Sequence, residues 1–304
     1  MSKSSPTNVA SSVHQRLLNE AKKTNRPFNE LLQYYAMERF LYRLSRSPHA
    51  KRFVLKGALM FAVWKASHGR PTMDIDLLGR MENSPEIIVS TFRSVCEMSV
   101  ESDGLLFDAG SVEAEPIAED ADYEGVRVRV RGMLGNARLT VQVDIGFADV
   151  VFPKPSQVEY PTILDMPAPK LQGYGRESAI AEKFEAMVNL GILNSRMKDF
   201  YDIWLLSRQF DFDGKVLAKA IEGTFANRKT DLMPNPVAFT PAFSQDHMKQ
   251  TQWQAFVRKS RLADAPTNLA NAIESIATFL GPITAAFSSG QPFRRQWKAP
   301  GPWA

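Results

Sequence analysis

The sequence predicts an α/β (α+β) protein in which an N-terminal part containing a sheet precedes a helical C-terminal part. Alternating apolar and polar residues predict two adjacent strands between residues 125 and 149, joined by a turn at 134–137. Five prolines then mark a loop over 152–170, and apolar residues at helical spacing dominate the rest of the chain. We therefore place the boundary between the two parts in this loop.

The first hundred residues are expected to hold three further helices, an apolar run that continues as a helix, and one strand. Residues 1–12 are small and polar, and we expect them to be disordered. The expected elements are a helix over 13–24, a helix over 25–47 with Asn29 as its N-cap, an apolar run at 53–56 that continues as a helix after Gly57, a strand over 73–79, and a helix over 84–98 capped by Ser84 with Pro85 at its first position.

The C-terminal part is predicted to consist of five helices. They cover 176–191 (ended by Gly191), 194–209 (capped by Ser195), 213–228, 247–262 and 267–287, with a loop over 230–247. The predicted organisation is a disordered segment over 1–12, a first domain over 13–165, a helical domain over 166–287 and a tail over 288–304.

Composition excludes several classes of protein. Apolar residues make up 44% and charged residues 23% of the 304 residues, the balance of a soluble globular protein. No run of 18 apolar residues and no signal peptide are evident, so we expect a cytoplasmic protein without a transmembrane helix. One cysteine and four scattered histidines make an internal disulfide impossible and a zinc site unexpected. A net charge of +4 is only a weak indication of an anionic partner.

The stretch GRPTMDIDLLGR carries the most specific chemistry. Asp74 and Asp76 share one face of the predicted strand, because side chains alternate along a strand. Two carboxylates so close together repel unless a cation lies between them, and oxygen ligands suit Mg²⁺. The second hairpin strand supplies Asp144, which completes the set if the strands are neighbours. The alternative is a solvated strand face.

Several residues near the aspartates are candidates for binding phosphate. The helix expected after Gly57 would offer free N–H groups, and Lys56, Arg70 and Thr72 would add donors to an NTP. A further set shares one face of a hairpin strand and is the candidate for contacting RNA or NTP phosphates: Arg127, Arg129 and Arg131.

These residues lie within a longer pattern. The segments LKGALMF and GRPTMDIDLL together resemble the signature of the DNA polymerase β-type nucleotidyltransferase superfamily, with Ala58 where Gly or Ser is common. The segments YYAMERFLYRLS, VDIGFADVV, AEKFEAMVNLG, NSRMKDFYDIW, QWQAFVRK and ATFLGPI follow in the order of the AbiEii/AbiGii (MenT-like) toxin family. The resemblance covers roughly residues 30 to 304. It implies a polymerase β-like core with a mixed sheet and a helical C-terminal domain.

The resemblance also implies an activity. It implies an enzyme that transfers a nucleoside monophosphate from an NTP to an acceptor with Mg²⁺, bound by Asp74, Asp76 and Asp144. In related toxins the acceptor is the 3′ end of tRNA, and the modification stops translation. The family is typically encoded beside an antitoxin gene. Other interpretations keep the chemistry with a protein hydroxyl or small-molecule acceptor, or reduce the chain to a non-catalytic NTP-binding module.

The C-terminal part contributes the remaining candidates. By resemblance, Lys183 binds the triphosphate or stabilises the leaving pyrophosphate; the alternative is a lysine whose stem covers apolar surface. Asp199 and Asp202 share a helical face and would orient Lys183 or the acceptor, or else form a surface pair with Arg196. We expect the Lys183 amine roughly 4–9 Å from Asp74 and Asp76, a span that a triphosphate bridges. Basic and aromatic residues in the 288–304 tail are a weaker candidate for binding single-stranded nucleic acid.

Overall fold

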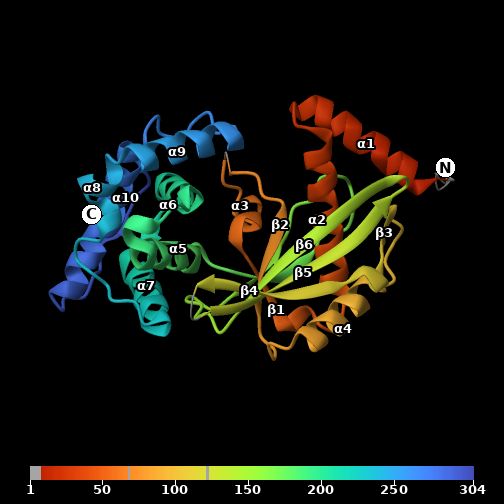
Figure 1. Cartoon of the computed structure of the whole chain (residues 1–304), viewed down its shortest axis with the longest axis horizontal. Coiled ribbons are helices and arrows are strands. Elements are labelled where there is room, and N and C mark those ends of the chain that lie inside the picture. Colours follow the sequence, from red (N-terminus) through yellow and green to blue (C-terminus); the bar gives the residue numbers. More distant parts are fainter. Residues whose placement is uncertain (1–7, 68, 121–122) are drawn as a thin grey trace. The chain divides into compact units, whose positions relative to one another are not determined.

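A computed structural model describes residues 8–67, 69–120 and 123–304 of the chain (Figure 1). The chain forms two compact units. The first comprises the chain up to Val63, Thr72–Ala148 and Ser156–Gly173, and the second comprises Trp64–Pro71, Asp149–Pro155 and Tyr174–Ala304. Two short segments that precede residue 156 therefore belong to the second unit.

The first unit is built on a mixed eight-stranded sheet with the order β3-β5-β6-β2-β1-β8-β7, in which β4 pairs with β5. The pairs β2–β6 and β1–β8 are parallel and the other pairs are antiparallel, which confirms the expected mixed sheet. The strands are β1 (Phe53–Lys56), β2 (Asp74–Gly79), β3 (Leu105–Phe107), β4 (Glu113–Asp120), β5 (Tyr123–Leu134), β6 (Ala137–Phe147), β7 (Ser156–Glu159) and β8 (Lys170–Gly173).

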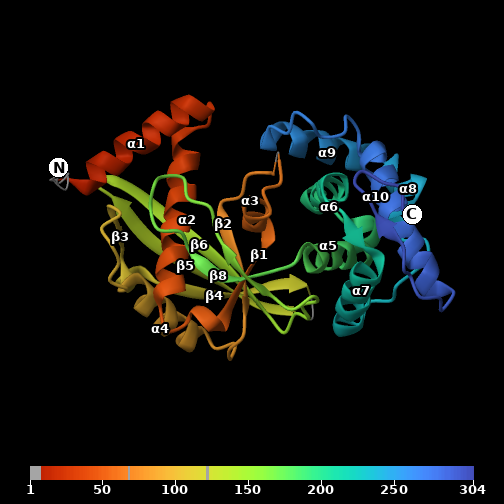
Figure 2. The ribbon, with the colours of Figure 1, turned by 180° about the vertical axis from the view of Figure 1, so that it is seen from behind.

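Helices cover the apolar face of this sheet (Figures 1 and 2). They are α1 (Val9–Thr24), α2 (Phe28–Arg46) and α4 (Pro85–Cys96), while the short helix α3 (Met60–Val63) follows β1 through a 3₁₀ turn. The ring of Phe92 on α4 packs 5.7 Å from Phe40 of α2 and 5.7 Å from Phe53 of β1. The alternating valines of β5 and β6 are buried on this side, so the intervening polar residues project from the opposite face.

Three sequence predictions in this unit need correction and one is confirmed. The Ser84 side chain caps α4 as expected, and it accepts a hydrogen bond from the Ile87 N–H group. Asn29 is not a cap, because α2 already begins at Phe28 after Pro27. The helix after Gly57 is short: a 3₁₀ turn over Gly57–Leu59 leads into α3, which ends at Val63. Helix α1 begins at Val9 rather than at residue 13, while residues 1–7 lie outside the described residues.

The second unit is helical. It contains α5 (Arg176–Leu190), α6 (Met197–Gln209), α7 (Gly214–Arg228), α8 (Pro241–Ser244), α9 (His247–Ser260) and α10 (Leu269–Ser288), with a small ribbon of β9 (Phe212–Asp213) and β10 (Gln296–Trp297). Gly191 follows α5 with a positive φ of 48°, as its predicted role as a terminator requires. Ser195 does not cap α6, since the Asn194 side chain instead accepts the N–H of Arg196.

The 288–304 tail folds back into the second unit. The indole N–H of Trp297 donates to the Ser207 carbonyl at 2.6 Å, and that of Trp303 donates to the Phe279 carbonyl at 2.7 Å. Both rings are buried and contact Phe279. The expectation that the aromatic residues of this tail stack on nucleic-acid bases is therefore wrong for these two tryptophans.

Helix α10 also departs from the sequence analysis. Of the helices in the described residues, α10 is the one that is long and apolar enough to cross a membrane, by length and composition only. The sequence analysis expected no such helix. Its apolar stripe is buried within the second unit, against Phe212 and the two tail tryptophans that surround Phe279. In this structure α10 is a core helix of its unit.

Candidate functional site

One row of charged side chains crosses four strands of the first unit. The register pairs Lys56 of β1 with Asp76 of β2, Asp76 with Asp144 of β6, and Asp144 with Arg127 of β5. Residues directly opposite in a sheet share a face, so these four side chains project from the side away from α2 and α4. Asp74 lies two residues before Asp76 on the same face.

The three aspartates form a compact oxygen cluster. One carboxylate oxygen from each of Asp74, Asp76 and Asp144 lies within 4.8 Å of the other two. Oxygens that share a Mg²⁺ at about 2.1 Å are separated by at most about 4.2 Å, so small side-chain rotations bring this trio into range. An all-carboxylate donor set is the kind that Mg²⁺ and Mn²⁺ prefer. The residues present therefore fit a divalent metal ion.

Thr72 and Gly57 shape the surroundings of two of these carboxylates. The Thr72 hydroxyl donates to Asp74, while the Thr72 N–H donates to the Tyr34 hydroxyl at 2.9 Å. Gly57 has a φ of +70°, and a Cβ atom there would overlap the Asp76 carboxylate. Glycine is thus required at this position both by the backbone conformation and by the close approach of Asp76.

Each of the three arginines on this face of β5 lies close to a carboxylate. Arg127 donates from Nε to Asp144 Oδ1 at 2.8 Å and from Nη2 to Asp144 Oδ2 at 2.7 Å. The hydrogen bond to Asp144 and its charge outweigh burial and raise the pKa of Arg127. Arg129 lies 2.8 Å from Glu115, and Arg131 lies 3.9 Å from Glu113. The side chains become steadily more exposed along the strand: 30% for Arg127, 42% for Arg129 and 72% for Arg131.

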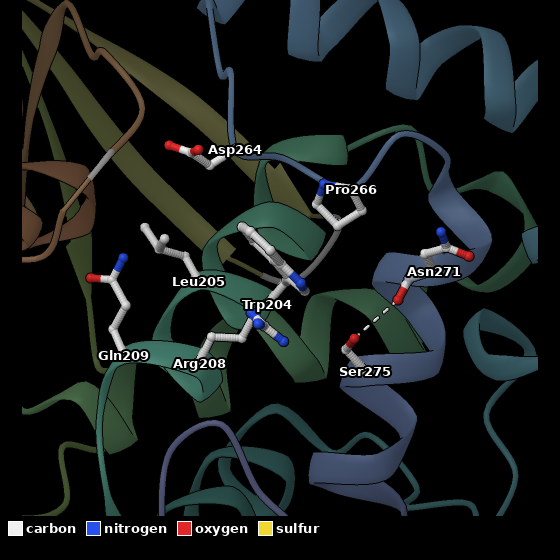
Figure 3. A pocket seen from close by; sticks show the side chains of 8 residues that line it. All are labelled: Trp204, Leu205, Arg208, Gln209, Asp264, Pro266, Asn271 and Ser275. Atoms are coloured by element: carbon white, nitrogen blue, oxygen red, sulfur yellow. Dashed lines mark hydrogen bonds between the residues drawn. The ribbon is translucent and has the colours of Figure 1, made fainter.

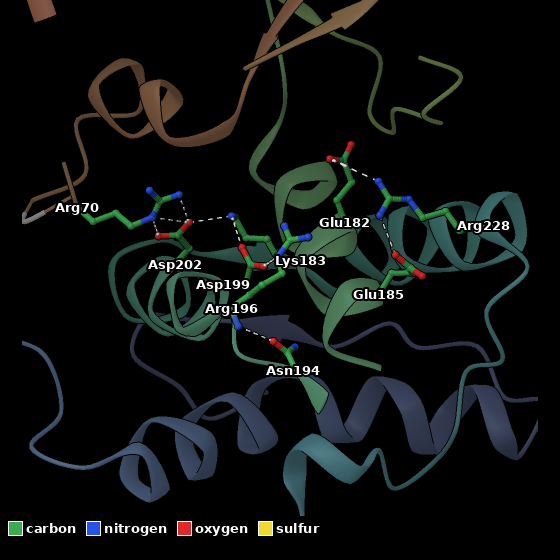
Figure 4. Close-up of polar contacts among 9 residues, drawn as sticks. All are labelled: Arg70, Glu182, Lys183, Glu185, Asn194, Arg196, Asp199, Asp202 and Arg228. Carbon is green, nitrogen blue, oxygen red and sulfur yellow. Dashed lines mark hydrogen bonds and ion pairs between the residues drawn. The ribbon is translucent and has the colours of Figure 1, made fainter. Parts of the chain in front are cut away.

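A second charged cluster lies within the helical unit (Figure 4). Lys183 of α5 places its Nζ 3.0 Å from Asp199 Oδ1 and 2.8 Å from Asp202 Oδ2, both on α6. Arg196 adds a contact of 2.8 Å to the other oxygen of Asp199. Arg70 donates from Nε to Asp202 Oδ1 at 3.0 Å. Two carboxylates are thus shared among three cations.

Burial and neighbouring charges fix the protonation states of Lys183 and Asp199. Burial opposes the charged form of Lys183, but Asp199 and Asp202 outweigh it and raise the pKa of the lysine. Burial likewise opposes ionisation of Asp199, yet Lys183 and Arg196 lower its pKa to about 2. At neutral pH Lys183 is therefore an ammonium ion, which offers a positive charge and not a base.

These contacts decide between the alternatives raised by the sequence. Asp199 is fully buried, so it is not part of a surface pair with Arg196. Lys183 is paired with two carboxylates, so it does not merely cover apolar surface. Arg70 was grouped with the residues around Asp74, but it belongs to the second unit and engages Asp202. Lys198 is exposed.

A separate cavity of about 400 Å³ lies in the helical unit (Figure 3). Its lining comes from α6, α10 and the connection before α10: Trp204, Leu205, Arg208, Gln209, Asp264, Pro266, Asn271 and Ser275. The Arg208 guanidinium lies 5.7 Å from the Trp204 ring centroid. None of the residues singled out in the sequence analysis lines it.

Two supporting residues were not found from the sequence. Tyr34 holds Thr72, and Gln142 donates to Asp144 Oδ2 at 3.4 Å. The role of Arg127 as the partner of Asp144 was also missed. Its signal was present, since a two-residue turn at Gly135–Asn136 fixes the hairpin register that pairs them.

Comparison with known proteins gives the family. Residues 39–280 match the family model described as nucleotidyl transferase AbiEii toxin, type IV toxin–antitoxin system. The fold and this match, which spans most of the chain, define a nucleotidyltransferase. The chain belongs to the AbiEii toxin family of type IV toxin–antitoxin systems. Membership implies an NTP substrate and a cognate antitoxin.

One solved structure shows the same fold at low sequence identity. JHP933 from Helicobacter pylori is 15% identical, with a TM-score of 0.50 over 86% of this chain and 94% of its own. A candidate nucleotidyltransferase from H. pylori is 13% identical, with a TM-score of 0.47 over 95% of this chain and 99% of its own. No curated protein gives a significant match.

Proposed function

We propose that this enzyme transfers a nucleoside monophosphate from an NTP to an RNA acceptor, the 3′ end of tRNA, in a Mg²⁺-dependent reaction that blocks translation in the cytoplasm. The observation that carries the proposal is the trio of carboxylate oxygens within 4.8 Å on one face of the sheet. When bound there, Mg²⁺ would neutralise triphosphate charge and favour ionisation of the acceptor hydroxyl.

Each residue has a role in the proposed reaction. Asp74, Asp76 and Asp144 hold the metal, and Lys56, Thr72 and the backbone at Gly57 border the triphosphate. The acceptor hydroxyl loses its proton to solvent and its oxygen forms a bond to the α-phosphorus, while the bond from that phosphorus to the oxygen shared with the β-phosphate breaks and pyrophosphate leaves. Lys183, protonated at neutral pH, stabilises the charge on that leaving group. Asp199 and Asp202 are positioning residues that act through Lys183.

We further propose that the two clusters bind one metal–NTP complex. Arg70, which pairs with Asp202, and Asp74 are separated by only three residues of chain. Four residue steps span at most about 14 Å even when fully extended. Covalent geometry therefore limits the separation of these two backbone positions. The proposal requires the Lys183 amine to lie roughly 4–9 Å from the aspartates when the nucleotide is bound, the span of a triphosphate.

The acceptor is the least constrained part of the proposal. Arg127, Arg129 and Arg131 share one face of β5, and a sequence pI of about 9.1 favours an anionic partner. These features support RNA over a neutral small molecule. A protein hydroxyl is the second candidate acceptor, and a cognate antitoxin without a membrane partner completes the proposed setting.

Labelled substrates test the proposal. The purified chain is incubated with total tRNA, Mg²⁺ and each α-labelled NTP in turn, beside the Asp76→Asn variant. We expect a labelled tRNA band with one or more preferred NTPs and none with the variant. Label on protein alone would support the second acceptor. NTP binding without any transfer would show a non-catalytic module and contradict the proposal.

A further inference from the structure

Arg127 differs from the other two arginines on its face of β5. It contacts both oxygens of Asp144 in a bidentate pair, whereas Arg129 and Arg131 each approach a glutamate whose side chain is more than half exposed. The side chain of Asp144 is only 10% exposed. The best-formed arginine pair of this strand is therefore made with a proposed metal ligand.

We infer that Arg127 occupies the Asp144 carboxylate before metal binding and exchanges it for a triphosphate oxygen when the metal–nucleotide complex binds. The inference rests on the proposed function and concerns the regulation of its metal site. The register places Arg127 directly opposite Asp144, so the pairing follows from the hairpin itself. Arg127 is thus built into the site, two residues along from the more exposed Arg129.

The physical reason lies in charge and shape. Three carboxylates within 4.8 Å repel one another, and a guanidinium beside them supplies a positive charge and two donors in the absence of metal. The same planar fork fits a phosphate as well as it fits a carboxylate. A bound metal weakens the need for Arg127 at Asp144, while a triphosphate offers it a new partner. Metal alone should bind weakly, and metal with triphosphate should bind strongly.

The proposed exchange predicts that one variant binds metal more tightly and triphosphate more weakly. Titration calorimetry on the nucleotide-free full chain measures Mn²⁺ binding, and a second titration with inorganic tripolyphosphate in excess Mn²⁺ measures the base-independent part of nucleotide binding. We expect Arg127→Gln to bind Mn²⁺ alone at least tenfold more tightly than wild type, and tripolyphosphate at least tenfold more weakly. The matched control Arg129→Gln removes the same charge from the same face, and its Mn²⁺ affinity should change less than threefold.

Two further variants separate the possible failures. Asp144→Asn should lose Mn²⁺ binding, and Arg127→Lys, which keeps the charge but lacks the fork, should bind Mn²⁺ at least threefold more tightly even if Arg127→Gln does not fold. Equal tightening in Arg127→Gln and Arg129→Gln would reduce the effect to net charge and overturn the exchange. Unchanged Mn²⁺ affinity in both Arg127 variants, with Asp144→Asn impaired, would overturn it while leaving the proposed function intact. Absence of Mn²⁺ binding in every protein would overturn both.

Discussion

The two charged clusters of this enzyme carry opposite excess charge. On the sheet, three carboxylates are flanked in the strand register by two cations, Lys56 and Arg127. In the helical unit, three cations share two buried carboxylates. The first cluster is therefore suited to a cation and the second to an anion, and a metal–triphosphate complex presents both. The comparison teaches that the sign of a cluster's net charge, rather than any single residue, indicates whether its ligand is a cation or an anion.

The largest expected effect comes from removing charge at the sheet cluster. Asp76→Asn and Asp74→Asn should each lower nucleotide transfer about a thousandfold or more, because metal stabilisation of the transition state amounts to several kcal/mol. Growth inhibition on expression should disappear as well. Thermal melting should stay near that of wild type. Full transfer by both variants with unchanged melting would show that the carboxylates do not hold a catalytic metal.

Lys183 provides the corresponding test in the helical unit. Lys183→Met keeps the apolar stem and removes the charge, so it isolates the electrostatic contribution. We expect a loss of about a hundredfold in the transfer rate, the size found when one charge-stabilising donor is removed. Steady-state rates with saturating NTP measure it. A methionine variant with the wild-type rate would limit Lys183 to packing and pairing with Asp199 and Asp202.

Asp199 should have a smaller effect that depends on pH. Asp199→Asn leaves Lys183 with Asp202 as its remaining carboxylate, so we expect about a tenfold loss in rate, as for other residues that orient a functional group. Because Asp199 helps to raise the pKa of Lys183, the variant should lose activity at a lower pH on the alkaline side. A purely structural role would lower the rate equally at every pH.

The smallest expected effects are changes in the free energy of unfolding with pH, and these changes should have opposite signs in the two units. The lowered pKa of Asp199, about 2, stabilises the helical unit above the ordinary aspartate pKa, and this contribution is lost as the pH falls from about 4 toward 2. Burial raises the pKa of Glu38 in α2 to about 7, despite its neighbour Arg39. A raised carboxyl pKa means that the free energy of unfolding decreases as the pH rises from about 4.5 to 7.

Chemical denaturation at a series of pH values tests these two opposite pH dependences of the free energy of unfolding. Glu38→Gln should remove the decrease between pH 4.5 and 7 while leaving the loss below pH 4 unchanged. Glu38 accepts the Ile163 N–H at 2.7 Å, and glutamine retains an acceptor for it. A wild-type protein whose stability rises between pH 4.5 and 7, and does so equally in the variant, would show that Glu38 is ionised in the folded state.

The sequence predicted those features of the fold and of the candidate site that depend on local periodicity. Alternation in the hairpin located Asp144 opposite a strand partner, and the pattern around Asp74 and Asp76 located the cluster of three carboxylates. Lys183, Asp199 and Asp202 were grouped by resemblance and helical spacing, and the structure places the Lys183 amine within hydrogen-bonding distance of both carboxylates.

Other features depend on long-range packing and could not be predicted. Arg70 lies four residues before Asp74 in the chain, yet its partner is Asp202, 132 residues later. The tail tryptophans looked like exposed aromatic residues, but Trp297 and Trp303 complete the core around Phe279. Two predicted helix caps were wrong. Helix α2 begins directly after Pro27, and near the start of α6 the Asn194 side chain accepts a backbone N–H. In each case the deciding contact is distant or lies outside the expected motif.

One binding measurement tests most directly whether both clusters serve the same ligand. Non-hydrolysable α,β-methylene NTPs are titrated in excess Mn²⁺ into wild type, Asp76→Asn, Lys183→Met and the double variant. A shared site predicts that each single variant binds at least tenfold more weakly, and that the double variant loses less than the product of the two single losses. Wild-type affinity in Lys183→Met, together with weak binding in Asp76→Asn, would contradict the account, because the helical cluster would then have no part in holding the triphosphate.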